Sequence, residues 1–108
     1  MIRDPEHEKM PRKQLEELQF KRLQARIKDV YEKVPFYKRT FKAKNVTPDD
    51  IKSLADLKKI PFTSKLDFRD NYPYGLMAVP LEKVVRIHSS SGTTGKPVIA
   101  PYSLADID

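Results

Sequence analysis

The sequence predicts an α+β protein in which a helical region precedes a β-hairpin. Between Pro11 and Pro35, apolar residues recur every three or four positions, the spacing of a helix with one apolar face. The segment 83–88 is rich in β-branched residues and alternates in polarity, which favours a strand. We therefore divide the chain into a flexible arm at 1–10, a helical region at 11–82 and a hairpin at 83–108.

One amphipathic helix is expected between the two prolines. Pro11 suits the first helical turn, whereas Pro35 disfavours helical continuation past the residue before it. The apolar stripe of this helix consists of Phe20, Leu23, Ile27, Val30, Tyr31 and Val34. Because such a stripe is about 100° wide, it must pack on another part of the chain, and the following Phe36, Tyr37 and Phe41 are candidates to cover it.

Short helical turns should follow. Thr47 precedes Pro48 and two aspartates, a pattern typical of a capped helix start. Ser53 and Thr63 are each able to begin a further turn. A second strand is expected around 98–102, and after it Ser103 and Asp106 have the spacing of a capping box.

Composition excludes several classes of function. The chain has 108 residues and no cysteine, so it has neither a disulfide framework nor a thiolate metal site. His7 and His88 are too few and too far apart to suggest a zinc site, and we predict no protein-built metal site. No apolar run approaches the ~20 residues of a membrane span. We expect a cytoplasmic protein that does not associate with membranes.

The net charge of +6 is unevenly distributed. Residues 1–44 contain 13 Lys and Arg against 7 Asp and Glu, and residues 45–108 contain 8 of each. A basic first part is able to meet an acidic partner, but no aromatic or glycine-rich interleaving accompanies the charge. We read it as a solvated helix face and expect no nucleic-acid binding.

The loop between the two predicted strands has the composition of an anion site. Glycine lets backbone amides approach phosphate oxygens closely, hydroxyls add donors, and a lysine supplies the countercharge. A Walker A loop is excluded, because Ser90 occupies its first glycine position and Pro97 its metal-binding hydroxyl position. The candidate phosphate-binding residues are Ser90, Ser91, Gly92, Thr93, Thr94, Gly95 and Lys96. His88 lies beside the loop and is more readily explained as a strand residue.

The unbroken string Ser-Gly-Thr-Thr-Gly-Lys-Pro at 91–97 resembles the phosphate loop of adenylate-forming acyl- and aryl-CoA synthetases. The segments 57–65, 69–76 and 86–92, together with Tyr-Glu-Lys-Val-Pro-Phe-Tyr at 31–37, look like the N-terminal region of phenylacetate-CoA ligases. The resemblance covers nearly all of the chain after its first ten residues. It implies an N-terminal fragment of a larger adenylate-forming domain.

This resemblance implies a two-step reaction on a small carboxylic acid. ATP adenylates the carboxylate with loss of pyrophosphate, and coenzyme A then displaces AMP to form a thioester. Residues 91–96 would hold the β- and γ-phosphates, with Mg²⁺ sharing their charge. No catalytic residue is expected within these 108 residues, so the chain alone should be inactive.

Two other functions stay open at this point. The chain could be part of a related adenylating enzyme that acts on another carboxylate, or a non-catalytic basic interaction module. If the hairpin normally continues into a larger sheet, its strand edges lack cover here, and the helix stripe would lack part of its cover as well. We therefore expect self-association, as a symmetric dimer.

Overall fold

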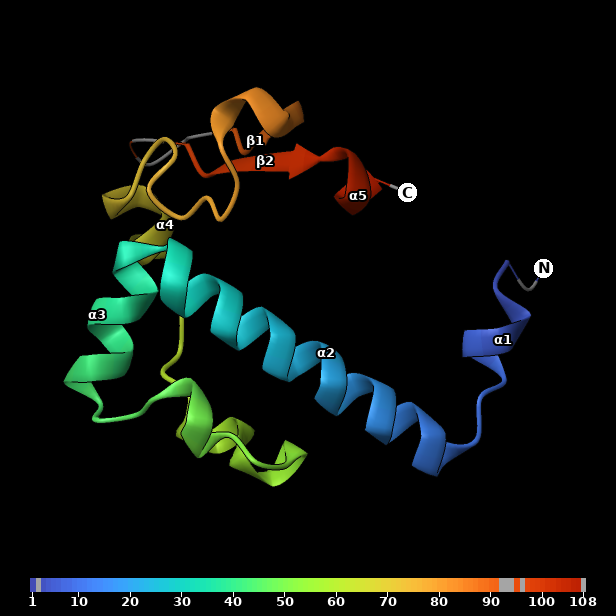
Figure 1. Cartoon of the computed structure of the whole chain (residues 1–108). Helices are drawn as coiled ribbons and strands as arrows, with labels where there is room; N and C mark the ends of the chain where they lie inside the picture. Colours follow the sequence, from blue (N-terminus) through green and yellow to red (C-terminus); the bar gives the residue numbers. More distant parts are fainter. Residues whose placement is uncertain (2, 92–94, 96, 108) are drawn as a thin grey trace.

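The chain forms two layers (Figure 1). The helical layer is built around the long helix and the helix after it, at 12–43, and the hairpin layer around the two strands at 84–103. The computed structural model describes every residue except 2, 92–94, 96 and 108. The predicted α+β class is confirmed, with the helices preceding a two-stranded sheet. In chain order the elements are α1 (Pro5–Glu8), α2 (Arg12–Lys33), α3 (Pro35–Ala43), the 3₁₀ turns η1 (Pro48–Asp50) and η2 (Leu54–Lys59), α4 (Lys65–Asp70), η3 (Leu81–Lys83), β1 (Val84–Ser89), β2 (Ile99–Ser103) and α5 (Leu104–Ile107).

The long helix α2 lies between the two prolines that predicted its limits. Val34 ends α2 in an extended conformation, with φ −113° and ψ 105°. Pro35 does not lead into a loop, because it occupies the first position of α3. Proline is tolerated there since its fixed φ suits the first turn and its missing N–H would have no helical partner. The segment proposed to cover the stripe is therefore a helix.

The stripe of α2 is covered by elements of the same chain. Ile27, Phe41 and Ile51 are buried against one another and form the core. Val34, the residue that ends α2, is buried as well. Partly buried side chains surround this core, namely Phe20, Leu23, Tyr31, Tyr37, Val46 and Ile60. The expectation that the stripe lacks part of its cover was wrong at these positions, because α3, η1 and η2 fold back on α2.

The turn after α3 returns the chain to this core. Asn45 has a positive φ of 57°. Its N–H donates to the carbonyl of Lys42, and the Val46 N–H donates to the carbonyl of Phe41, both at 3.0 Å. These two bonds are the Schellman arrangement, in which a left-handed residue satisfies the last helical carbonyls. Val46 consequently packs against the core beside Phe41.

Each of the short turns η1, η2 and α4 follows a hydroxyl residue, with one difference from the prediction. Thr47 precedes η1 and Ser53 precedes η2, as expected. The cap of α4 is Ser64, not Thr63. Ser64 has an acid three residues on, so the Asp67 carboxylate accepts from the Ser64 N–H at 2.7 Å. Thr63 lacks such an acid and instead donates its hydroxyl to the Tyr37 hydroxyl at 3.3 Å.

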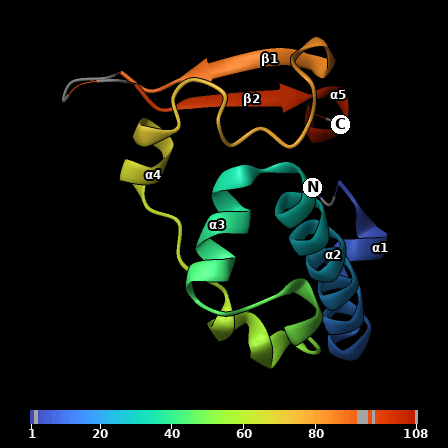
Figure 2. The same ribbon diagram turned by 60° about the vertical axis from the view of Figure 1, so that its left-hand side comes forward.

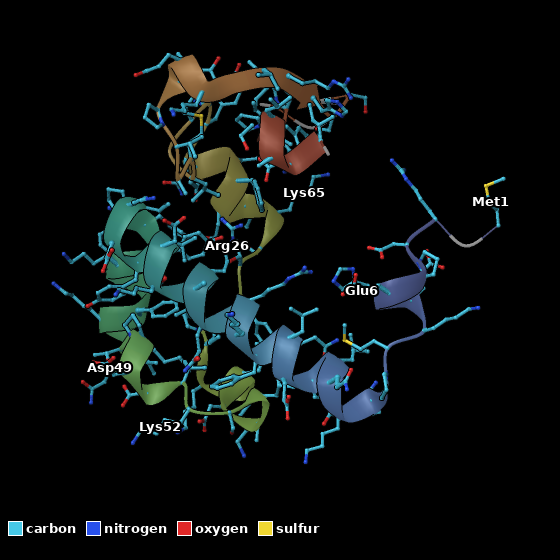
Figure 3. The ribbon with its side chains drawn as sticks, turned by 45° about the vertical axis from the view of Figure 1, so that its right-hand side comes forward. Met1, Glu6, Arg26, Asp49, Lys52 and Lys65 are labelled. Atoms are coloured by element: carbon cyan, nitrogen blue, oxygen red, sulfur yellow. The ribbon has the colours of Figure 1, made fainter. Side chains whose placement is uncertain are left out.

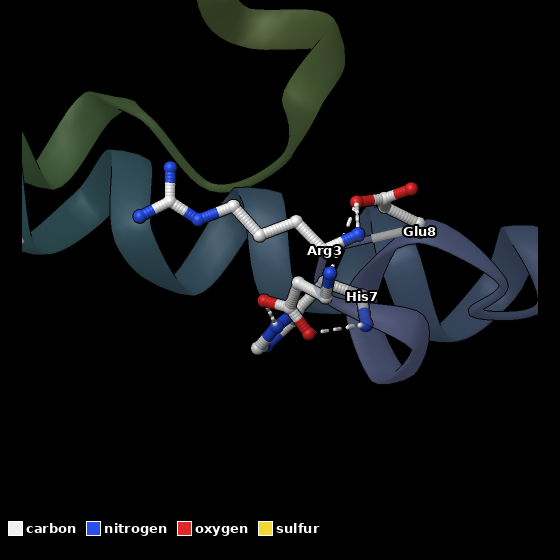
Figure 4. A network of polar contacts seen from close by, with 4 residues as sticks. Arg3, His7 and Glu8 are labelled. Carbon is white, nitrogen blue, oxygen red and sulfur yellow. Dashed lines mark hydrogen bonds and ion pairs between the residues drawn. The ribbon is translucent and has the colours of Figure 1, made fainter. Parts of the chain in front are cut away.

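At the start of the chain, a one-turn helix that the sequence did not predict lies within 1–10 (Figure 4). The N–H groups of Arg3 and Asp4 donate to Glu8 Oε1 at 3.2 and 3.1 Å. Asp4 accepts from the His7 N–H at 3.3 Å and lies 2.6 Å from His7 Nδ1. These bonds lower the pKa of the Asp4 carboxyl. His7 is therefore part of a local cap, and the flexibility of this arm stays a prediction.

The hairpin pairs β1 and β2 in antiparallel register (Figure 2). The first strand begins one residue later than predicted, since Lys83 belongs to η3. Ser89 pairs with Ile99, His88 with Ala100 and Arg86 with Tyr102, and a bulge lies between Val84 and Arg86. Five of the six β1 residues are exposed. The described part of the chain therefore gives β1 little cover, whereas all five residues of β2 are partly buried.

The two layers meet loosely. A cavity of about 460 Å³ lies against the hairpin, and its lining includes Phe68 of α4, Tyr102 of β2 and, from α2, Arg26. The radius of gyration is 16.1 Å, against about 13 Å for a closely packed chain of this length. None of the helices in the described ranges combines the length and the hydrophobicity that crossing a membrane requires.

Candidate functional site

The predicted phosphate loop connects β1 to β2. Of its seven candidate residues, Ser90, Ser91 and Gly95 are described, and all three are exposed. Gly92, Thr93, Thr94 and Lys96 lie outside the described residues. The phosphate-binding role of the whole set therefore stays a prediction, and the described residues show how the base of the loop is built.

At that base, the two strands remain paired for one position beyond the ladder. The Ser90 N–H donates to the carbonyl of Val98 at 3.0 Å. In return, the Val98 N–H donates to Ser90 Oγ at 2.9 Å. The Ser89 hydroxyl donates to the Ser90 carbonyl at 3.1 Å. The residues that flank 91–97 in sequence are thus joined, Ser90 to Val98.

Gly95 adopts a backbone conformation that suits glycine. Its φ is 113°, in a region that residues with a side chain rarely adopt because Cβ and the carbonyl oxygen crowd each other. A Cβ at this position would meet no other atom within 4 Å. Glycine is therefore required here by its backbone angle and not by close packing.

His88 faces a strand neighbour. Its ring centroid lies 4.9 Å from that of Tyr102 at an interplanar angle of 58°. The two residues are on adjacent strands, since His88 pairs with Ala100 and Tyr102 with Arg86. Such diagonal pairs of aromatic side chains stabilise a sheet face. This contact agrees with the strand interpretation of His88.

At the far end of the hairpin, Ser103 and Asp106 of the predicted capping box are hydrogen-bonded to each other. Asp106 accepts from the Ser103 N–H and from the Ser103 hydroxyl, both at 2.8 Å. The bond from the Ser103 backbone, followed by that from its hydroxyl, lowers the pKa of the Asp106 carboxyl. The charge of Arg26 on α2 lowers this pKa further, and Figure 3 shows Arg26 on the middle turns of that helix. The ion pair that Arg26 forms is with Asp29 of its own helix, at 3.7 Å.

The sequence identified the loop but missed how it is closed. A serine that caps its own strand and a serine that contacts phosphate look the same in a sequence. The sequence feature that bears on this closure is the run of three serines at 89–91. The Ser90 hydroxyl accepts from the Val98 N–H. No pattern in the sequence indicates this contact.

Comparison with solved structures first gives the class of protein. A crystal structure of 2-hydroxyisobutyryl-CoA ligase in complex with 2-HIB-AMP and CoA superposes with a TM-score of 0.86 and 31% identity. The match covers 94% of this chain and 23% of that one. A second crystal structure of the same ligase, in an open conformation, gives a TM-score of 0.84 and 29% identity over 94% of this chain and 24% of that one. The chain has the fold of part of a CoA ligase.

Curated relatives share more of the sequence than these solved structures do. The phenylacetate-coenzyme A ligase of Aromatoleum evansii is 57% identical over 101 residues, which are 94% of this chain and 23% of that protein. The ligases of the same name from Escherichia coli and Thermus thermophilus are 55% and 50% identical, over 88% and 99% of this chain and 22% and 24% of those proteins. No protein-family model matches the chain.

The resemblance to phenylacetate-CoA ligases is thus confirmed over almost the whole chain. The chain spans about a quarter of the length of the relatives it matches.

Proposed function

We propose that this chain contributes the ATP phosphate-binding loop of an AMP-forming phenylacetate-CoA ligase that works in the cytoplasm. One observation carries the proposal. A loop with the composition of an anion site joins two strands of a chain whose fold matches a CoA ligase solved with an acyl-adenylate and CoA. Sequence identity favours phenylacetate as the acid, because relatives with that name are more similar than the 2-hydroxyisobutyryl-CoA ligase.

The chemistry expected of the loop is electrostatic. When a carboxylate attacks the α-phosphorus of ATP, negative charge accumulates on the departing pyrophosphate. Donors that are already positioned stabilise that charge without reorganising. Ser91 and Gly95 provide exposed donors in the described part of the loop. Thr93, Thr94 and Lys96 are proposed to complete the site, and Mg²⁺ that arrives with ATP would share the phosphate charge.

The other steps of the reaction need groups beyond those proposed here. A phosphate loop without a pocket for the acid or for coenzyme A is unable to orient the reactants. The 108-residue chain on its own should therefore form no thioester. Two of the basic residues on α2 are paired with acids one turn away, Arg12 with Glu16 at 3.0 Å and Lys33 with Asp29 at 2.5 Å. These pairs fit the solvated-face interpretation better than a basic interaction module.

The test is Lys96→Ala in a full-length ligase that contains this segment. Loss of one positioned charge should weaken the adenylation half-reaction by roughly 2–4 kcal/mol, the scale for removing one such donor. Pyrophosphate exchange into ATP measures this step directly. Lys83→Ala is the matched control, because Lys83 precedes β1 at the opposite end of the hairpin. An exchange rate unchanged by Lys96→Ala would remove the loop from the mechanism.

A further inference from the structure

The base of the loop departs from a regular antiparallel ladder at one bond. Ser89 pairs with Ile99, so continuing the register places Ser90 opposite Val98. In a regular hydrogen-bonded pair, two opposite residues exchange backbone N–H to carbonyl bonds in both directions. Here one of the two is regular, from the Ser90 N–H to the Val98 carbonyl. In the other, Ser90 Oγ replaces the Ser90 carbonyl as the acceptor for the Val98 N–H.

This replacement frees the Ser90 carbonyl from the ladder. The carbonyl accepts instead from the neighbouring Ser89 hydroxyl at 3.1 Å. Because the peptide unit is planar, the direction of the Ser90 carbonyl also fixes the direction of the Ser91 N–H, which is the first amide of the loop. The Ser90 hydroxyl therefore keeps the strands closed while the peptide that begins the loop leaves the ladder geometry.

We propose that Ser90 is a positioning residue that closes the base of the loop and sets its first amide, and is not one of the groups that hold phosphate. The inference rests on the proposed function of the loop. In this proposal the three consecutive serines have different roles. The Ser89 hydroxyl donates to the Ser90 carbonyl, Ser90 Oγ accepts from the Val98 amide, and Ser91 is exposed.

Serine suits this role better than most alternatives. Its hydroxyl has two acceptor lone pairs and reaches back to the level of its own backbone, as in serine-based turns. Alanine provides no acceptor, so the Val98 N–H would lose its partner. Threonine keeps the hydroxyl at the same position, and its β-branched side chain is well accommodated in an extended segment. Ser90→Thr is therefore the conservative variant that should preserve the bond.

The experiment uses NMR on the 108-residue chain itself. Amide hydrogen exchange at Val98 is measured in the wild type, Ser90→Ala, Ser90→Thr and Ser89→Ala. Loss of one net hydrogen bond should accelerate Val98 exchange about fivefold in Ser90→Ala. Exchange in Ser90→Thr and Ser89→Ala should stay near the wild-type rate, since both keep an acceptor at Oγ of residue 90. Inorganic pyrophosphate is then titrated into each protein and followed by the Ser91 amide shift.

The expected result is faster Val98 exchange and weaker pyrophosphate binding in Ser90→Ala, with both restored in Ser90→Thr. Unchanged Val98 exchange in Ser90→Ala overturns the proposal. If pyrophosphate affinity nevertheless falls, Ser90 is a direct phosphate ligand. Faster exchange with unchanged affinity also overturns it, because closing the base then has no bearing on binding. If wild-type chain binds no pyrophosphate, the proposed function fails for this chain, and the exchange rates alone decide what the Ser90 hydroxyl does.

Discussion

Both halves of the chain contain large apolar residues, but the two halves differ in how far these side chains are buried. Among the described residues, all the buried ones lie in the first half, at Ile27, Val34, Phe41 and Ile51. From residue 52 onward, no described residue is buried. Phe62 is fully exposed, and Val85 and Ile87 of β1 are 57% and 48% exposed.

The difference follows from what each half has available to pack against. In the first half a 22-residue helix provides a surface on which α3 and two short turns fold back. In the second half, the described elements beside the two-stranded sheet are helices of at most six residues and loops. A lone hairpin is marginal in water and needs further strands or a helix for stability. We infer that the core formed within residues 20–60 stabilises that part of the chain by itself, and that the hairpin layer needs additional cover.

The largest expected effect compares one substitution in the two halves. Phe41→Ala should lower the free energy of unfolding by roughly 3–4 kcal/mol, because it removes a buried ring and leaves a cavity. Phe62→Ala should change it by less than about 0.5 kcal/mol, since that ring contacts mostly solvent. Urea denaturation followed by circular dichroism measures both. Equal effects would show that the two halves share one core.

A smaller, stabilising effect is expected at the end of α3. Asn45→Gly should raise the free energy of unfolding by about 0.5 kcal/mol, because glycine adopts the left-handed conformation at lower cost. Asn71 provides the control. It ends α4 with an ordinary φ of −103°, and its side chain donates to the Asp67 carbonyl at 2.8 Å. Asn71→Gly should therefore not raise the free energy of unfolding. A gain at Asn71 equal to that at Asn45 would exclude the backbone explanation.

The smallest effect is a pH dependence that should differ between the halves. Hydrogen bonds from the Thr47 backbone and hydroxyl lower the pKa of Asp50, and equivalent bonds from Ser103 lower that of Asp106. A carboxyl with a lowered folded pKa stabilises the fold above its unfolded pKa, about 3.9, and this stabilisation is lost as the pH falls through the folded value. Both contributions are therefore present near neutral pH and disappear in acid.

Removing each carboxyl separates the two contributions. Asp50→Asn should flatten the acid side of the curve of urea midpoint against pH, because η1 packs on α2. Asp106→Asn should leave that curve unchanged, since α5 has no buried residue and its fraying does not report on the core. Both proteins are compared from pH 6 down to pH 3. A larger flattening in Asp106→Asn would show that the hairpin layer takes part in the cooperative fold.

The sequence predicted most of the elements but not their relations in space. Periodicity and proline placed α2, and β-branched residues placed the hairpin, because these signals depend on neighbours along the chain. Pro35 was read only as an end, although proline also begins helices, and so α3 was missed. The cover of the stripe and the partner of the Ser90 hydroxyl depend on contacts between distant residues. Ile51, the third member of the core, follows a cap pattern that says nothing about burial.

The central claim is that the hairpin layer lacks cover, and we propose that a second copy supplies it in the isolated chain. Light scattering at micromolar concentration tests this most directly. The account predicts a mass approaching twice the 12.6 kDa of the monomer. Replacing both exposed apolar residues of β1, with Val85→Thr and Ile87→Thr, should return the mass towards the monomer. A strictly monomeric 12.6 kDa species that unfolds cooperatively would contradict the claim, because the chain would then close its own core.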